Sequence, residues 1–274
     1  MNVKLIAFDL DGTVLLNHRN IPEENIKAMK YAHEKGVYVV PATGRIASFL
    51  PSQLLNVDFI EYALTCNGGS IDNIKTKQCV HGAYINGAIA RKVNEVLKKY
   101  NLYIEYYVKG GIPYTKTITP ERAMIEYGLP EQKRYFLSKD YIYFNDIEEF
   151  LADDLREYEK INVTFIPEYA REDIRNGLKQ IPEIITSSSL PDNLEINSVT
   201  SGKGNSLIAL CDYLNIDIKN AMAIGDGEND LPMLKVAGIS VAMGNSCEKA
   251  LKTAKYKTTD CDDCGFAKAV YDFV

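Results

Sequence analysis

Two aspartates close a short apolar segment near the amino terminus. Residues 5–8 read Leu-Ile-Ala-Phe, and the chain continues with Asp9, Leu10, Asp11 and Gly12. Such an apolar segment is typical of a buried strand in a parallel sheet. Side chains two positions apart on an extended chain point the same way, so both carboxyl groups are expected to face one crevice. Gly12 allows a sharp turn immediately after them.

Two further apolar segments also end in polar residues. Ala-Thr-Gly-Arg at 42–45 closes the segment 37–43, and Gly-Asp-Gly-Glu-Asn-Asp at 225–230 closes the segment 220–226. Lys203 is expected to open the helix that precedes the last of these segments. Because doubly wound parallel sheets bind ligands at the carboxyl ends of their strands, these residues are predicted to converge on one crevice.

The acidic residues of this set indicate a divalent cation. Four carboxyl groups would meet there, those of Asp9, Asp11, Asp226 and Asp230. So much negative charge needs compensation, and hard carboxylate oxygens with no Cys or His nearby suit Mg²⁺. Thr43, the backbone around Gly44 and Lys203 would supply donors and positive charge, which a tetrahedral phosphate requires. The sequence therefore predicts a site that holds Mg²⁺ and a phosphoryl group together.

The elements that must position this site alternate between strand and helix. Residues 22–36 carry helix signals, with Pro22 in the first turn and Gly36 at the end. Beyond Asp226 we expect a helix at 230–238, a strand at 239–243 and helices at 246–254 and 265–274. This alternation predicts an α/β fold with a doubly wound parallel sheet.

The middle of the chain differs from the rest. It combines a predicted helix at 87–100 with strand-like segments at 102–108, 141–144 and 161–166. Ten of the eighteen tyrosines lie between Tyr103 and Tyr169. For any single one we favour a place in a half-buried strand, which suits tyrosine, over stacking on a sugar or ring of a ligand. The predicted domains are an α/β core of residues 1–83 and 191–274 and an inserted α+β module of residues 84–190.

Composition limits the class of protein. Of 274 residues, 46% are hydrophobic and 25% are charged, as in ordinary globular proteins. The net charge of -6 and the lack of a basic run argue against nucleic acid as a partner. No apolar run approaches the roughly 18 residues of a membrane span, and no signal segment opens the chain. We therefore expect a cytoplasmic protein without a membrane partner, and no feature indicates the oligomeric state.

Two of the six cysteines, Cys261 and Cys264, have a spacing that occurs in zinc sites and redox motifs. A zinc site needs two more ligands, and the chain has only His18, His33 and His81 with no second close cysteine pair. We therefore favour a plain turn. The scattered cysteines suit a reducing compartment.

In order along the chain, "DLDGT" (9–13), Thr43, Lys203 and "GDGEND" (225–230) resemble the four motifs of the haloacid dehalogenase superfamily of phosphotransferases. Together with "NGG" (67–69), they resemble most closely its Cof-like phosphatases. The resemblance implies that the inserted module is a cap closing over a small phosphorylated metabolite. Sugar phosphates are the leading substrate class, followed by phosphorylated cofactors such as flavin mononucleotide or pyridoxal phosphate.

The resemblance also implies a role for each site residue. Asp9 would be the nucleophile that becomes an aspartyl phosphate, and Asp11 would protonate the leaving alcohol and later deprotonate water. The backbone carbonyl of Asp11 would join Asp9 and Asp226 around Mg²⁺, with Asp230 holding Lys203 or a metal-bound water. Phosphate binding falls to Leu10, Thr43, Gly44, Lys203 and Asn229.

Two alternatives stay open at this point. A phosphomutase of the same superfamily would return the phosphoryl group to the substrate instead of transferring it to water. A signalling receiver module also uses a phosphorylated aspartate, Mg²⁺ and a lysine, but acts without turnover. Receiver modules are shorter, and they lack both a long insertion and an acid two positions after the nucleophile. Steady release of phosphate would distinguish a hydrolase from both.

Overall fold

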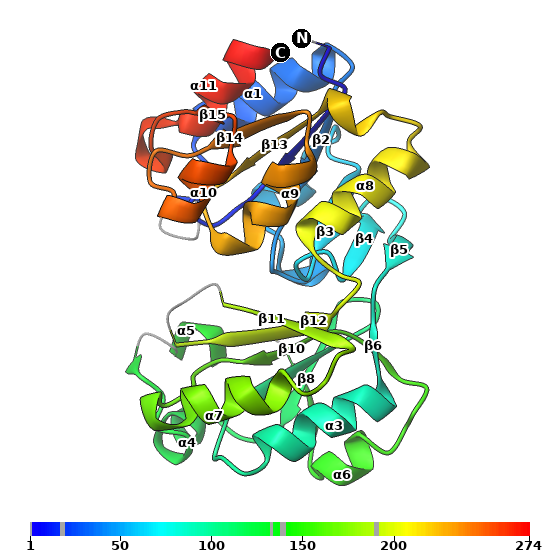
Figure 1. The fold of residues 1–274 in the computed structure, drawn as a ribbon, viewed down its shortest axis with the longest axis vertical. Helices are drawn as coiled ribbons and strands as arrows, with labels where there is room; N and C mark the ends of the chain where they lie inside the picture. Colours follow the sequence, from blue (N-terminus) through cyan, green and yellow to red (C-terminus); the bar gives the residue numbers. More distant parts are fainter. Residues whose placement is uncertain (1, 17–19, 132–133, 138–140, 189–191) are drawn as a thin grey trace. The chain divides into compact units, whose positions relative to one another are not determined.

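The computed structural model describes residues 2–16, 20–131, 134–137, 141–188 and 192–274. It divides into two compact units, which are described separately (Figure 1). The first unit comprises Met1–Gly82 and Ser201–Val274, and the second comprises Ala83–Thr200. Among the described residues, no helix is both long enough and apolar enough to cross a membrane.

The first unit contains the elements that carry every predicted site residue. Its strands are β1 (Leu5–Phe8), β2 (Tyr38–Pro41), β3 (Tyr62–Thr65), β4 (Ser70–Asn73), β5 (Gln78–Gly82), β13 (Ala221–Gly225), β14 (Ile239–Ala242) and β15 (Tyr256–Lys257). Its helices are α1 (Glu23–Glu34), α2 (Ser52–Leu55), α8 (Lys203–Tyr213), α9 (Leu231–Val236), α10 (Glu248–Thr253) and α11 (Gly265–Phe273). Short 3-10 turns lie at Ala47–Phe49, Ile218–Asn220, Glu228–Asp230 and Cys261–Asp263.

The main sheet of the first unit is parallel, with the strand order β15-β14-β13-β1-β2. Strand β1 lies between β13 and β2, and Phe8 at its end is paired with Ile224 of β13 and Pro41 of β2. The three polar segments that follow these strands therefore leave the sheet at the same edge. This is the convergence predicted from the sequence.

Side-chain alternation along β1 explains why helices cover both faces of this sheet. Ile6 and Phe8 belong to an apolar cluster that includes residues of α1 and α11. Leu5 and Ala7 belong to a second cluster that includes residues of α8, α9 and α10. Because successive side chains of a strand point to opposite faces, the strand is buried from both sides. The predicted doubly wound α/β core is confirmed (Figure 1).

A second sheet of the first unit was not predicted from the sequence. Strands β3, β4 and β5 form an antiparallel sheet of three strands. It adjoins the end of β2, where Ala42 forms a parallel bridge with Leu64. This small sheet therefore supports the polar segment that follows β2.

The second unit is an α+β module, as predicted. Its strands are β6 (Ile85–Asn86), β7 (Ile104–Val108), β8 (Ile112–Lys116), β9 (Ile142–Phe144), β10 (Glu157–Val163), β11 (Ile184–Ser187) and β12 (Leu194–Ser198). Its helices are α3 (Gly87–Leu97), α4 (Pro120–Glu126), α5 (Arg134–Leu137), α6 (Ile147–Phe150) and α7 (Glu168–Leu178). The sheet order is β11-β12-β10-β7-β8-β9, with β6 also paired to β10.

The carboxyl-terminal limit of this module lies further along the chain than the sequence indicated. The expected return to the core at residue 191 would place β12 in the first unit. Instead β12 pairs antiparallel with β10 and β11, and Leu194 and Ile196 are buried in the apolar cluster of the second unit. The chain rejoins the first unit at Ser201.

Candidate active site

A buried lysine holds two of the predicted aspartates. The Nζ atom of Lys203 lies 2.5 Å from Oδ1 of Asp9 and 2.6 Å from Oδ1 of Asp230. The side chain of Lys203 is fully buried, because this residue begins α8 and α8 packs against the sheet. Asp9 follows β1 and is 6% exposed. The ammonium group therefore compensates carboxylates in a place from which water is largely excluded.

Burial and charge act in opposite directions on this group of ions. Burial raises the pKa of Asp9, the Lys203 ammonium lowers it, and the charges of Asp230 and Asp226 raise it further, so that it ends well above its ordinary value. Burial lowers the pKa of Lys203, but the charges of Asp230 and Asp9 outweigh burial and raise it. Lys203 is therefore a permanent cation at neutral pH.

Asp230 also closes the turn that follows β13. Its Oδ2 atom accepts hydrogen bonds of 2.9 Å from the backbone N–H groups of Asp226 and Gly227. Its other oxygen accepts from Lys203, so both oxygens of this fully buried carboxylate are engaged by donors of the protein. The structure thus brings Asp230 to Lys203, one of the two positions expected for it.

Asp226 lies beside the loop that follows β1. Its Oδ1 atom accepts a hydrogen bond of 3.0 Å from Oγ1 of Thr13. A Cβ atom built on Gly12 would lie only 2.5 Å from Oδ2 of Asp226, so only glycine permits this approach. Burial, with a further contribution from the charge of Asp230, raises the pKa of Asp226 to about 6.

The carboxylates of this site fit a hard divalent cation. Asp9, Asp226 and Asp230 each offer an oxygen within 4.8 Å of the other two. Three carboxylates face one ammonium group, which leaves a net negative charge when all are ionised. Oxygen donors of this kind suit Mg²⁺. Because Asp230 already accepts three hydrogen bonds from Lys203 and two backbone N–H groups, Asp9 and Asp226 are the side chains better placed to hold the ion.

The Asp11 side chain is not part of this acidic group. It forms a bidentate ion pair with Arg45, with distances of 3.0 Å from Nε to Oδ2 and 2.7 Å from Nη2 to Oδ1. Arg45 follows Thr43 and Gly44 beyond β2, and its backbone N–H donates to Oγ1 of Thr43. The sequence interpretation gave Arg45 no role. Its position two residues after Thr43, at the end of a predicted strand, was the feature of the sequence that could have indicated a role for Arg45.

The remaining predicted phosphate ligands differ in what they could contribute. Thr43 is 1% exposed, and its hydroxyl already accepts a hydrogen bond. The Leu10 side chain belongs to the apolar core, so only its backbone could bind a ligand. Asn229 donates from Nδ2 to Oδ1 of Asn67 at 3.2 Å. Asn67 is a second residue that was given no role, although the "NGG" segment that contains it had been noted.

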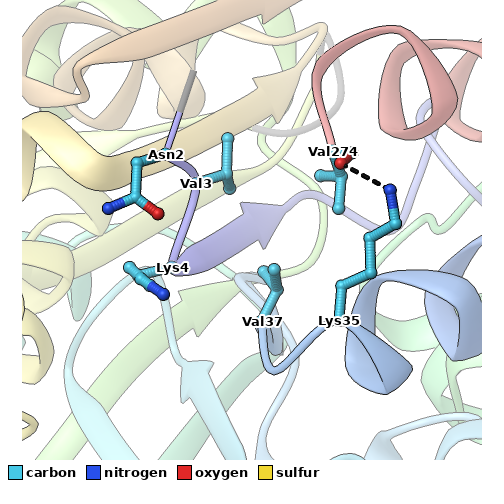
Figure 2. A pocket seen from close by; sticks show the side chains of 6 residues that line it. All are labelled: Asn2, Val3, Lys4, Lys35, Val37 and Val274. Atoms are coloured by element: carbon cyan, nitrogen blue, oxygen red, sulfur yellow. Dashed lines mark hydrogen bonds between the residues drawn. The ribbon is translucent and has the colours of Figure 1, made fainter.

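A pocket elsewhere in the first unit is unrelated to this site. It is lined by Asn2, Val3, Lys4, Lys35, Val37 and Val274, and Lys35 donates to the backbone oxygen of Val274 at 2.9 Å (Figure 2). Its residues 2–4 precede β1, whereas Asp9 follows that strand. The pocket therefore lies at the opposite end of the strand.

Cys261 and Cys264 lie in a turn, as expected. The backbone N–H of Cys264 donates to the carbonyl of Cys261 at 3.1 Å, immediately before α11. Burial raises the pKa of the Cys261 thiol to about 11, so it is a neutral thiol. Within the described ranges, no group of three or more possible metal ligands includes either cysteine. His18 lies outside the described residues.

Comparison with known proteins agrees with this geometry. A family model described as haloacid dehalogenase-like hydrolase matches residues 6–270. The chain is 27% identical over 278 residues to the 5-amino-6-(5-phospho-D-ribitylamino)uracil phosphatase YcsE of Bacillus subtilis, covering 100% of this chain and 97% of that protein. It is 27% identical over 282 residues to a phosphoglycolate phosphatase of Methanobrevibacter smithii, covering 100% of both.

A solved structure extends the likeness to the fold. The structure of a sugar phosphatase of haloacid dehalogenase subclass IIB matches with a TM-score of 0.82 and 25% identity over 99% of each chain. The match includes both units, since it leaves almost none of the chain uncovered. The chain therefore belongs to the haloacid dehalogenase-like hydrolase family, among its Cof-like phosphatases.

Proposed function

We propose that this phosphatase hydrolyses small phosphate monoesters with the help of Mg²⁺, and that Asp9 carries the phosphoryl group between substrate and water. The observation that carries the proposal is the buried contact of Asp9 with Lys203 beside Asp226, at the end of β1. A buried ion group of this kind adds little to stability in itself, so its presence at a strand end favours a functional role.

Asp9 is the proposed nucleophile because one of its oxygens is fixed by Lys203. A carboxylate held in this way can direct its other oxygen at a phosphorus atom. A bound Mg²⁺ would neutralise charge on the phosphate and on the carboxylates. Asp9 and Asp226, with the backbone carbonyl of Asp11, are the proposed ligands, while Asp230 keeps Lys203 in place.

Asp11 is the proposed acid and base. It would protonate the departing alcohol and then take a proton from the water that attacks the Asp9 phosphoryl group. The bidentate pair with Arg45 restrains the Asp11 carboxylate to one orientation. Arg45 would therefore orient Asp11 as the base, and the pair, which favours the ionised carboxylate, would open when Asp11 takes up the proton that it gives to the leaving alcohol. Backbone groups at Leu10 and Gly44, with Thr43 and Asn229, are the proposed remaining phosphate contacts.

Small phosphorylated metabolites are the proposed substrates, with sugar phosphates first. The support is that the similar solved structure is that of a sugar phosphatase and that YcsE acts on the phosphate of a ribityl chain. Both substrates carry their phosphate on a polyol. Residues 83–200 would form the cap that selects among them. We place the protein in the cytoplasm, which fits the lack of a disulfide among its six described cysteines.

Release of inorganic phosphate from a panel of phosphorylated metabolites tests the proposal. With Mg²⁺ we expect steady release from sugar phosphates, loss of activity with a chelator and recovery when Mg²⁺ is restored. Asp226→Ala should lose nearly all activity while keeping its fold by circular dichroism. Isomerised substrate without free phosphate would favour the mutase. A single phosphorylation event without turnover would favour the receiver module. Full activity in the presence of chelator would contradict the proposed dependence on Mg²⁺.

A further inference from the structure

The side chain of Asn245 links two loops of the first unit. Its Nδ2 atom donates to the carbonyl of Gly12 at 2.8 Å. Its Oδ1 atom accepts from the backbone N–H of Cys261 at 2.9 Å. One amide group thus connects the loop after β1 with the turn before α11, and it does so from the turn after β14.

The turn that carries Asn245 is bound to the backbone of the strand that bears Asp226. The N–H of Met243 donates to the carbonyl of Gly225 at 3.2 Å, and the N–H of Cys247 donates to the carbonyl of Asp226 at 2.9 Å. The hydroxyl of Ser246 also donates to Gly225 at 3.3 Å. Asn245 is therefore fixed relative to Asp226 by bonds on both sides of it.

The other end of the link lies in the loop that carries Asp9 and Asp11. Gly12 has φ 85° and approaches the Asp226 carboxylate more closely than any other residue type could. The next residue, Thr13, donates its hydroxyl to the same carboxylate. A shift of the Gly12 peptide would therefore alter the separation between the Asp9 loop and Asp226.

The contact with Cys261 decides which way the amide points. A backbone N–H can only donate, so the amide oxygen faces Cys261 and the amide nitrogen faces the carbonyl of Gly12. The segment that leads into the turn at 261–264 is held as well, because the N–H of Gly244 donates to the carbonyl of Thr259 at 3.0 Å. This gives the cysteine-containing turn a role that depends on its backbone and not on its thiols.

We propose that Asn245 is a positioning residue of the metal site, which sets the spacing of the Asp9 loop from Asp226 through the carbonyl of Gly12. The inference rests on the proposed binding of Mg²⁺ by Asp9 and Asp226. Residues that orient metal ligands without touching the metal typically change its affinity by about 10- to 100-fold when replaced. Asn245 acts on the loop backbone, so we expect roughly the lower end of that range.

Titration calorimetry with Mg²⁺ tests this role, using Asn245→Asp as the main variant. Aspartate keeps the acceptor for Cys261 but loses the donor to Gly12. Its added charge alone would attract Mg²⁺, so weaker binding is attributable to the lost contact. Asn245→Ala removes both contacts without adding charge, and it provides the same comparison if Asn245→Asp fails to fold. Asn73→Asp is the matched control, since Asn73 also links backbone and side-chain partners in this unit but lies away from the site.

We expect Asn245→Asp and Asn245→Ala to bind Mg²⁺ about tenfold more weakly than the wild-type protein. Their kcat should be largely restored at saturating Mg²⁺. The control Asn73→Asp should bind Mg²⁺ with wild-type affinity. Wild-type affinity in both Asn245 variants would overturn the inference and leave the proposed function intact, even if their thermal stability in chelator fell. Absence of Mg²⁺ binding by the wild-type protein would contradict the proposed function and this inference with it.

Discussion

Lys203 shows how a single residue organises the candidate site. Its ammonium group binds Asp9 and Asp230 in a place where unpaired charges would be very unfavourable. The order of motifs allowed Lys203 to be placed near the acids from the sequence. Its simultaneous contact with both carboxylates depends on how α8 packs against the sheet, which no local pattern specifies.

Arg45 and Asn67 are the site residues that the sequence did not single out. Both lie in short segments that had been noted, yet a lone arginine or asparagine in a loop is usually solvated. Their partners, Asp11 and Asn229, are far away along the chain: Arg45 meets Asp11 because parallel strands end at one edge, and Asn67 meets Asn229 from the turn between the antiparallel strands β3 and β4. Residue type at a strand end predicted the location of the site, but not these pairings.

The pKa of Asp226 leads to a prediction about pH and metal binding. The pKa of Asp226 in the folded protein is about 6, above its ordinary value of 3.8. The protonated carboxyl group therefore favours the folded, metal-free protein at low pH. This contribution to the free energy of unfolding is lost as the pH rises through the folded-state pKa. Mg²⁺ binds the ionised carboxylate and therefore competes with the proton. The rise in melting temperature caused by Mg²⁺ should be small near about pH 5 and larger near about pH 7.

Thermal unfolding with and without Mg²⁺ across this range measures the effect. Asp226→Asn, which cannot ionise there, is the control and should show little shift with Mg²⁺ at any pH. A Mg²⁺-induced shift of the same size at both ends of the range in the wild-type protein would argue against Asp226 as a ligand.

At the scale of elements, the strands that carry the site were predictable because they are buried on both faces. β1, β2 and β13 read as apolar runs ending in polar residues, and they pair in parallel with their polar ends at one edge of the sheet, as expected. β3 and β4 are strands of only four residues, too short to show a clear alternation, and the Ser-Ile-Asp-Asn composition of β4 resembles that of a loop. Their pairing makes them strands.

The placement of β12 shows a different limit. All five residues of β12 are buried, so the segment has no exposed face, and such a pattern fits a strand in either unit. Only the pairing with β10 and β11 decides which unit it joins. Pairing partners are a property of the whole sheet, so the boundary could not be read from the segment itself.

The junction between α8 and the turn after β3 gives an element-scale prediction. Gly68 has φ 83°, and a Cβ atom there would lie 2.4 Å from the carbonyl oxygen of Gly202, which precedes Lys203. Gly68→Ala should therefore push back the start of α8 and weaken the contact of Lys203 with Asp9. The strain of a left-handed alanine should lower the free energy of unfolding by about 1–2 kcal/mol. The clash should lower it by about 1–3 kcal/mol more, and kcat should fall as well.

Gly36→Ala is the matched control for this prediction. Gly36 has φ 78° and no neighbour within 4 Å of the built Cβ, so its replacement tests conformational strain alone. Urea unfolding and phosphate release measure both variants. Equal loss of stability in the two, with unchanged activity in Gly68→Ala, would contradict the account of this junction.

At the scale of the whole molecule, the two units use polar residues differently. Four tyrosines of the second unit take part in its internal packing and hydrogen bonding. Tyr106 and Tyr158 are buried in its apolar cluster, and Tyr107 and Tyr141 donate to the buried carboxylate of Glu105 at 2.7 Å. The first unit instead gathers its buried charges at one edge of a parallel sheet. Chemistry is therefore expected from the first unit, which holds every residue proposed to react.

The central claim is that Asp9 carries the phosphoryl group, and mass spectrometry of quenched Asp11→Asn tests it most directly. Without its acid and base, this variant should still be phosphorylated by an ester with a good leaving group, such as a nitrophenyl phosphate, and then hydrolyse slowly. The expected defect in turnover is about 10² to 10⁴. We predict one added phosphoryl group on the peptide that contains Asp9, and none in Asp9→Asn. A phosphoryl group on another peptide, or substantial turnover by Asp9→Asn, would contradict the account.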